Sequence, residues 1–171
     1  MRGRSRIDNL KPSTAYLSLG SNLSPEQNIQ FALEQLTKIF GEISSSSIYL
    51  TKAVGFSGPD FHNSVVKIQT TLTPSELIDQ LHSIEQMTGR VSGTKKFNDR
   101  SLDIDVLIYD DLIDLNLNIP RDEIFKYGFV LEPLAELNPE GLHPVVKRSF
   151  FDLWNSLKGT LDVTEKIIEK N

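Results

Sequence analysis

The chain of 171 residues contains no cysteine. This absence excludes disulfide scaffolds, thiolate zinc sites and cysteine nucleophiles, so the fold must be stabilised by packing. The sequence also lacks any apolar run near the roughly 18–20 residues that span a bilayer. Its opening segment lacks the apolar stretch of a secretory signal. We therefore expect a cytoplasmic protein with no membrane partner.

An excess of basic residues is absent as well. The formal net charge of −5 argues against a general nucleic-acid binder, although a local basic cluster could still hold one phosphorylated ligand. The length, with 39% hydrophobic residues, suits one compact domain and is too short for two ordinary ones. We predict a single domain over 13–171, and we expect the polar, basic residues 1–12 to be an extension outside the fold.

Hydrophobic periodicity predicts an ordered succession of strands and helices. Ser24–Gln27 and Thr73–Glu76 carry helix-start signals, each with a proline at the first helical position and a capping-box pattern. Further short helices are predicted over 131–137 and 149–157. Together with four strands, these elements predict a ferredoxin-like βαββαβ α+β sandwich with an antiparallel sheet and additional C-terminal helices. The predicted strands cover about 14–19, 43–51, 63–71 and 102–109.

The last predicted strand carries two acidic residues, Asp103 and Asp105. Residues two apart in a strand point to the same side, roughly 6.5 Å apart along the chain. Two carboxylates so placed suit magnesium, which prefers oxygen ligands. An acidic solvent face is the other interpretation. We expect Leu107 and Tyr109 to share the acidic face, and the opposite face to hold Leu102, Ile104, Val106 and Ile108.

A basic, glycine-containing segment, 89–100, lies directly before this strand, with Arg90 and Arg100 near its ends. A cationic loop beside a metal pair suits phosphoryl transfer, where charge neutralisation and positioning do most of the catalysis. A plain surface loop is the alternative. Gly20–Asn22, just before a helix start, is either an anion-binding turn or a simple connection. The histidines lack metal-like spacing, so none is assigned a role.

The succession of motifs resembles the hydroxymethyldihydropterin pyrophosphokinase family. The similarity runs from about Ala15 to Leu137 and depends on the order and spacing of the motifs. The matching motifs are AYLSLGSNL (15–23), SSIYLT (46–51), Gly55, FHNSVV (61–66), IEQMTGR (84–90), RSLDIDVLIY (100–109), GFVLEPLAEL (128–137) and NPE (138–140).

The resemblance implies a reaction and a set of roles. The pterin hydroxymethyl oxygen would attack the β-phosphorus of ATP, the co-substrate, releasing AMP and giving the pterin diphosphate for folate biosynthesis. Asp103 and Asp105 would hold two magnesium ions, and Arg90 and Arg100 would stabilise the phosphates as catalytic residues. The remaining roles implied are ATP binding by Glu85, Arg90 and Arg100, and pterin binding by Thr51, Val54, Phe61, Asn63 and Phe129.

The chain departs from the family pattern at four places. Lys52-Ala53 replaces paired prolines, and 97–99 replaces Trp-Gly-Pro. Arg121-Asp122 replaces His-Tyr, and Tyr127 replaces arginine. These positions belong to the ATP half of the site, where we predict that Arg121 supplies positive charge.

Three other functions remain open at this stage. One is a polymerase-β-type nucleotidyltransferase, although its Gly-Ser and Asp-x-Asp motifs lie closer together than in this chain. Another is an inactive paralogue that binds nucleotide or pterin without turnover. A third is a ferredoxin-like RNA-binding module, which the acidic charge disfavours. We expect a monomeric enzyme that binds two small substrates.

Overall fold

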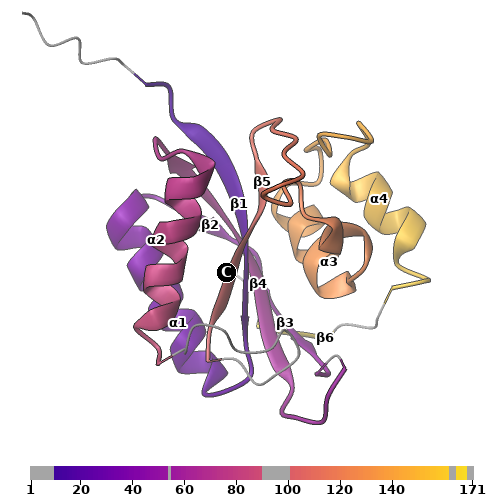
Figure 1. Ribbon diagram of the computed structural model, residues 1–171. Helices are drawn as coiled ribbons and strands as arrows, with labels where there is room; N and C mark the ends of the chain where they lie inside the picture. The colour runs from indigo at the N-terminus through magenta and orange to yellow at the C-terminus, as the bar shows by residue number, and fades with distance from the viewer. Residues whose placement is uncertain (1–9, 54, 90–100, 162–164, 169–171) are drawn as a thin grey trace, which may run out of the picture.

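The computed structural model describes residues 10–53, 55–89, 101–161 and 165–168. These ranges contain both strands and helices (Figure 1). The elements are β1 (Ser13–Ser21), α1 (Pro25–Phe40), β2 (Ser44–Ser45), β3 (Ile48–Thr51), β4 (Phe61–Thr70), α2 (Pro74–Gln86), β5 (Asp103–Tyr109), the 3₁₀ helix η1 (Asp122–Phe125), α3 (Gly128–Leu137), α4 (Phe150–Leu157) and β6 (Glu165–Ile168).

The strands form one antiparallel sheet in the order β5-β1-β4-β3-β6, and β2 also pairs with β4. Removing β6 leaves the strand order of a ferredoxin-like βαββαβ unit, so the predicted fold class is confirmed. The predicted strand 43–51 is two short strands, β2 and β3. β6, which extends the sheet beyond β3, was not predicted from the sequence.

The two long helices begin at the predicted prolines but are capped differently. Thr73 closes the predicted capping box with Glu76, whose backbone N–H donates to the threonine hydroxyl. Ser24 instead lies in the left-handed region, with φ 43°, and makes no side-chain cap bond, so the capping box predicted there is wrong. Among the described residues, none of the helices combines the length and apolar character needed to cross a bilayer.

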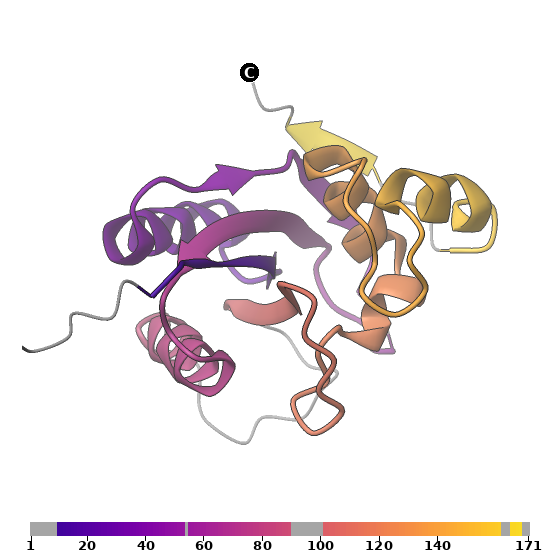
Figure 2. The ribbon, with the colours of Figure 1, turned by 90° about the horizontal axis from the view of Figure 1, so that it is seen from above.

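One sheet face is covered by α1 and α2, as Figures 1 and 2 show. Each helix carries apolar residues at helical spacing along one side, and the strands carry apolar residues at every second position. These two apolar surfaces pack against each other. This first core contains Leu17, Leu19, Ile29, Leu36, Val66, Ile68, Leu77, Leu81, Ile84, Leu102, Ile104 and Val106.

The other face is covered by η1, α3 and α4, which makes the sheet the middle of three layers (Figure 2). The Ser149 hydroxyl caps α4 by accepting from the Asp152 N–H, as predicted for that helix. The second core contains Tyr16, Val65, Leu107, Ile108, Ile124, Val130, Leu131, Leu134, Phe150 and Leu153.

A β-bulge interrupts the alternation of β5. The β1–β5 register shifts between Tyr16, opposite Ile108, and Leu17, opposite Val106, so Leu107 is the extra residue. After such a bulge the side chains change faces. Ile108 therefore packs in the second core and Tyr109 against the first, which is the reverse of the prediction. Leu107 lies on the same face as Asp103 and Asp105, as predicted.

Candidate active site

Asp103 and Asp105 lie at the start of β5, an edge strand of the sheet. Asp103 is opposite Gly20, and Asp105 is opposite Ser18. Both acids come before the bulge at Leu107, so they point to the same face, that of the second core and α3. The predicted arrangement of the two carboxylates on one face therefore holds in the structure.

The two carboxylates interact directly with each other. Asp105 is hydrogen-bonded to Asp103, and one third of its side chain is exposed. Burial raises the pKa of Asp105 to about 7, and the negative charge of Asp103 adds to that rise, while Arg121 opposes it. Two carboxylates this close cannot both ionise freely without a cation nearby. The pair is therefore a site that favours positive charge.

Arg121 supplies part of that positive charge. Its Nη1 lies 3.5 Å from Asp105 Oδ1, and its Nη2 lies 2.7 Å from Glu123 Oε1. Its backbone N–H donates to the Leu107 carbonyl at 2.9 Å, which fastens the loop to β5 two residues beyond Asp105. Burial alone would lower the pKa of Arg121, but the Asp105 and Glu123 carboxylates raise it. The guanidinium therefore remains a fixed cation beside the acid pair.

The predicted pterin residues of the sheet, Thr51, Phe61 and Asn63, lie on the same face as the acid pair, and Phe129 lies in α3, which covers that face. Asn63 is opposite Gly20 in β1, and Gly20 is opposite Asp103, so one row across three strands joins the acid pair to Asn63. A Cβ atom on Gly20 would lie 3.4 Å from Asn63 Oδ1 and 3.9 Å from the Phe61 ring. Gly20 therefore leaves open the space between the acid pair and these residues.

Asn63 is held in place by its neighbours in β3. Its side-chain amide donates to Thr51 Oγ1 at 2.9 Å and to the Tyr49 carbonyl at 3.4 Å. Both Asn63 and Thr51 are buried. Because the amide N–H groups are used in this way, the orientation of the carboxamide is set before any ligand binds. The structure thus brings Thr51 and Asn63 together, as predicted.

The two predicted stacking aromatics are partly buried, and each contacts another aromatic ring. Phe61, in β4, meets Phe56 edge-on with ring centroids 6.3 Å apart. Phe129, near the start of α3, stacks on Tyr127 at 4.9 Å with an interplanar angle of 14°. Tyr127 is the residue that replaces the family's arginine, so this departure adds an aromatic ring beside Phe129.

Glu85 occupies a buried position at the end of α2. Its Oε1 accepts from the Ile104 N–H at 2.7 Å, and Ile104 lies between the two acids in sequence. A free N–H on an edge strand needs a partner, and this carboxylate provides one. Glu85 thereby ties α2 to the strand that carries the acid pair.

Side chains of the Gly20–Asn22 segment form hydrogen bonds with two other parts of the chain. The Ser21 hydroxyl donates to the Ser101 carbonyl, and the Asn22 amide donates to the Pro59 carbonyl at 3.2 Å. Ser21 and Asn22 are both buried. These side-chain contacts tie the end of β1 to the segments that precede β4 and β5.

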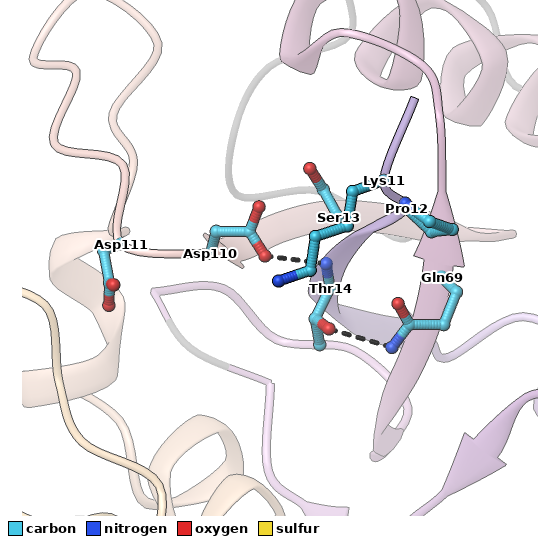
Figure 3. Close-up of a pocket in the computed structure, with 7 residues that line it drawn as sticks. All are labelled: Lys11, Pro12, Ser13, Thr14, Gln69, Asp110 and Asp111. Carbon is cyan, nitrogen blue, oxygen red and sulfur yellow. Dashed lines mark hydrogen bonds between the residues drawn. The ribbon is translucent and has the colours of Figure 1, made fainter. Parts of the chain in front are cut away.

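Three predicted site residues, Val54, Arg90 and Arg100, lie outside the described residues, as do positions 97–99. A pocket does lie at the other end of the sheet, where the Asp110 carboxylate accepts from the Thr14 N–H at 2.8 Å (Figure 3). Asp110 follows the last residue of β5, about 20 Å along the strand from Asp103. This pocket is therefore separate from the acid pair.

The donor set suits a hard divalent cation that is completed by substrate oxygens. Within the ranges that the structure describes, no group of three or more His, Asp or Glu side chains could hold a metal ion by itself. Magnesium is commonly held by one or two carboxylates plus phosphate oxygens, so Asp103 and Asp105 fit that mode. Such a pair on one face of an α+β sandwich suits the class of enzymes that transfer phosphate groups with the help of metal ions.

Comparison with known proteins identifies the family. The family model for 7,8-dihydro-6-hydroxymethylpterin-pyrophosphokinase (HPPK) matches residues 16–139. The 2-amino-4-hydroxy-6-hydroxymethyldihydropteridine pyrophosphokinase of Haemophilus influenzae is 38% identical over 130 residues, covering 72% of this chain and 81% of the relative. The enzyme of the same name from Aquifex aeolicus is 34% identical over 154 residues, covering 85% and 94%. The chain belongs to the HPPK family.

Solved structures agree on the fold. The crystal structure of wild-type Plasmodium falciparum HPPK-DHPS matches with a TM-score of 0.67 at 15% identity. The match covers 90% of this chain and 43% of that one, so this chain spans less than half of that longer protein. The family assignment sets aside the nucleotidyltransferase and RNA-binding alternatives.

Sequence reasoning missed Glu123. The segment Arg121-Asp122-Glu123 places two acids after the arginine, and either could have been its partner. The turn of η1 decides between them: Glu123 bonds Arg121, while Asp122 pairs with Lys126 at 2.5 Å. The only signal in the sequence was an acid near a predicted ATP-binding arginine.

Proposed function

We propose that this chain transfers pyrophosphate from ATP to 6-hydroxymethyl-7,8-dihydropterin, giving the pterin diphosphate and AMP, in folate biosynthesis. The observation that carries the proposal is the row Asp103–Gly20–Asn63 across three adjacent strands. It gives one sheet face both a cation-attracting acid pair and an oriented carboxamide. Family membership supports the same reaction.

The pterin half of the site is formed by β3, β4 and α3. Thr51 and Asn63 offer a hydrogen-bonding edge, to which Val54 would add backbone groups. Phe61 and Phe129 offer rings that are only partly buried, suited to stacking on a flat heterocycle. Gly20 leaves room between this edge and the acid pair, so the hydroxymethyl group of a bound pterin would point toward Asp103.

The ATP half is formed around β5 and η1. Asp103 and Asp105 would hold two magnesium ions, which would neutralise charge on the ATP phosphates. Arg121 would add a fixed positive charge, with Arg90 and Arg100 as further phosphate ligands. Glu85 acts on this half by supporting β5 at Ile104.

In the reaction, the pterin hydroxymethyl oxygen forms a bond to the β-phosphorus of ATP. The bond between that phosphorus and the oxygen bridging to the α-phosphorus breaks, and AMP leaves with that oxygen. The hydroxyl proton is lost to solvent or buffer. The residues above contribute by orienting the two substrates in line and by stabilising the phosphate charge. The cytoplasmic location and the monomeric state remain predictions.

One observation favours a second candidate, a paralogue that binds ligands without turnover. Arg121 already lies within 3.5 Å of Asp105, at a position where the family has histidine. AMP release from magnesium and ATP, measured with and without the pterin, separates the two functions. Pterin-dependent AMP that disappears in Asp105→Ala supports the pyrophosphokinase. Binding of ATP or pterin without AMP release would establish the inactive paralogue.

A further inference from the structure

Arg121 has two acidic neighbours at different distances. Its contact with Glu123 Oε1, at 2.7 Å, has the length of a charge-assisted hydrogen bond. Its contact with Asp105 Oδ1, at 3.5 Å, is longer than a good hydrogen bond. The guanidinium is therefore hydrogen-bonded to Glu123, while its ion pair with Asp105 is longer.

Glu123 is well placed to hold the Arg121 guanidinium at this distance from Asp105. The next residue, Ile124, is fully buried in the second core and anchors η1. The Glu123 side chain is only 14% exposed, and its Oε2 is buried without a hydrogen bond among the described residues. A partly buried ion pair is less screened than a surface pair, so this contact constrains Arg121 more than a solvent-exposed pair would.

The neighbouring acid behaves differently. Asp122 is exposed and pairs with Lys126 at 2.5 Å. It carries the same charge as Glu123, one position away in the same turn, but no ion pair joins it to Arg121 within the described residues. Glu123 is therefore the acid of η1 that pairs with Arg121.

We propose that Glu123 is a positioning residue that holds the Arg121 guanidinium off Asp105 and so keeps the acid pair open to a divalent cation. This inference rests on the proposed function of the acid pair. Without Glu123, Arg121 shortens its ion pair with Asp105 to a hydrogen bond and competes with the metal. With Glu123, the same guanidinium stays beside the site, where it can meet a phosphate oxygen.

The test measures binding of Mn²⁺ as the probe ion. Free Mn²⁺ is followed by its EPR signal in the presence of an ATP analogue with a methylene bridge between the α- and β-phosphates, against a protein-free blank. Glu123→Gln is expected to weaken protein-dependent Mn²⁺ binding by about fivefold, the size of a partly screened charge interaction. Asp111→Asn removes an exposed carboxylate at the other end of β5 and should change this binding by less than about twofold. Melting temperatures of both variants check folding.

A double variant distinguishes a positioning role of Glu123 from an effect of its negative charge alone. If Glu123 acts through Arg121, Glu123→Gln has little effect in an Arg121→Ala background, because the competing cation is absent. An equal loss in both backgrounds overturns the proposal, since it would show that Glu123 acts by its charge alone. Unchanged binding in Glu123→Gln overturns it too. Failure of the wild-type protein itself to bind Mn²⁺ would instead overturn the cation site of the proposed function, and the proposal with it.

Discussion

Replacing Asp105 with Asn should make the metal-free protein more stable at neutral and alkaline pH. In the folded protein, burial and the nearby Asp103 raise the pKa of Asp105 to about 7. In the unfolded chain this pKa returns to about 3.9. Between these values the folded state keeps a proton that the unfolded state has released, so stability falls as the pH rises from about 4 to 7. Asparagine cannot ionise and escapes this loss.

The size of the effect follows from the pKa difference and the exposure of Asp105. About three pH units at 1.36 kcal/mol each set a ceiling near 4 kcal/mol. One third of the side chain is exposed. Solvent screening and relaxation therefore reduce the ceiling to about 1–2 kcal/mol. For a domain of this length, that corresponds to a rise in melting temperature of about 3–6 °C.

The assay is thermal or urea unfolding in EDTA at pH 4 and pH 8. The stability difference between Asp105→Asn and wild type should be small at pH 4 and should grow to its full value at pH 8. Asp111→Asn removes an exposed carboxylate just beyond the other end of β5 and serves as the control, with little change between the two pH values expected. A constant difference for Asp105→Asn across this range would refute the reasoning.

Three further perturbations test other parts of the molecule. Asp103→Ala should abolish nearly all pterin-dependent AMP release while the protein remains folded by circular dichroism, because the phosphate charge loses its cation; wild-type rates would contradict the metal site. Gly20→Leu should raise the pterin KM by about tenfold or more with a smaller effect on the ATP KM, since the new side chain would fill the space beside Asn63; equal effects on both constants would contradict the placement of the two half-sites. Burial lowers the pKa of His143, so its contribution to stability is complete above about pH 6.5 and is lost as the pH falls toward the lower folded pKa. His143→Asn should therefore show a shallower loss of unfolding free energy than wild type between pH 7.5 and 5.5; parallel curves would show that this histidine does not titrate differently on folding.

Much of the site was predictable because its signals are local. Period-two alternation identified the strand that carries Asp103 and Asp105, and their spacing placed both on one face. The Thr73 capping box predicted the start of α2, which the structure confirms. The order of motifs pointed to the family. The roles of Arg90 and Arg100 remain predictions, since both lie outside the described residues.

Register and turn geometry escaped prediction because they depend on distant partners. The bulge at Leu107 appears only when β5 pairs with β1, and it reverses the faces of the residues that follow. The alignment of Asp103, Gly20 and Asn63 in one row likewise requires β1 to lie between β5 and β4. No local pattern in the sequence encodes either feature.

By itself, then, the sequence determined the βαββαβ order of the main elements, the fold class, the acid pair and the family, because backbone periodicity and motif spacing act over a few residues. The tertiary structure decided which groups meet. In the folded chain, Glu85 contacts the edge of β5, and Glu123 rather than Asp122 pairs with Arg121. Such choices depend on burial and on the turn of η1, since a charge selects its partner by distance and by desolvation in the folded chain.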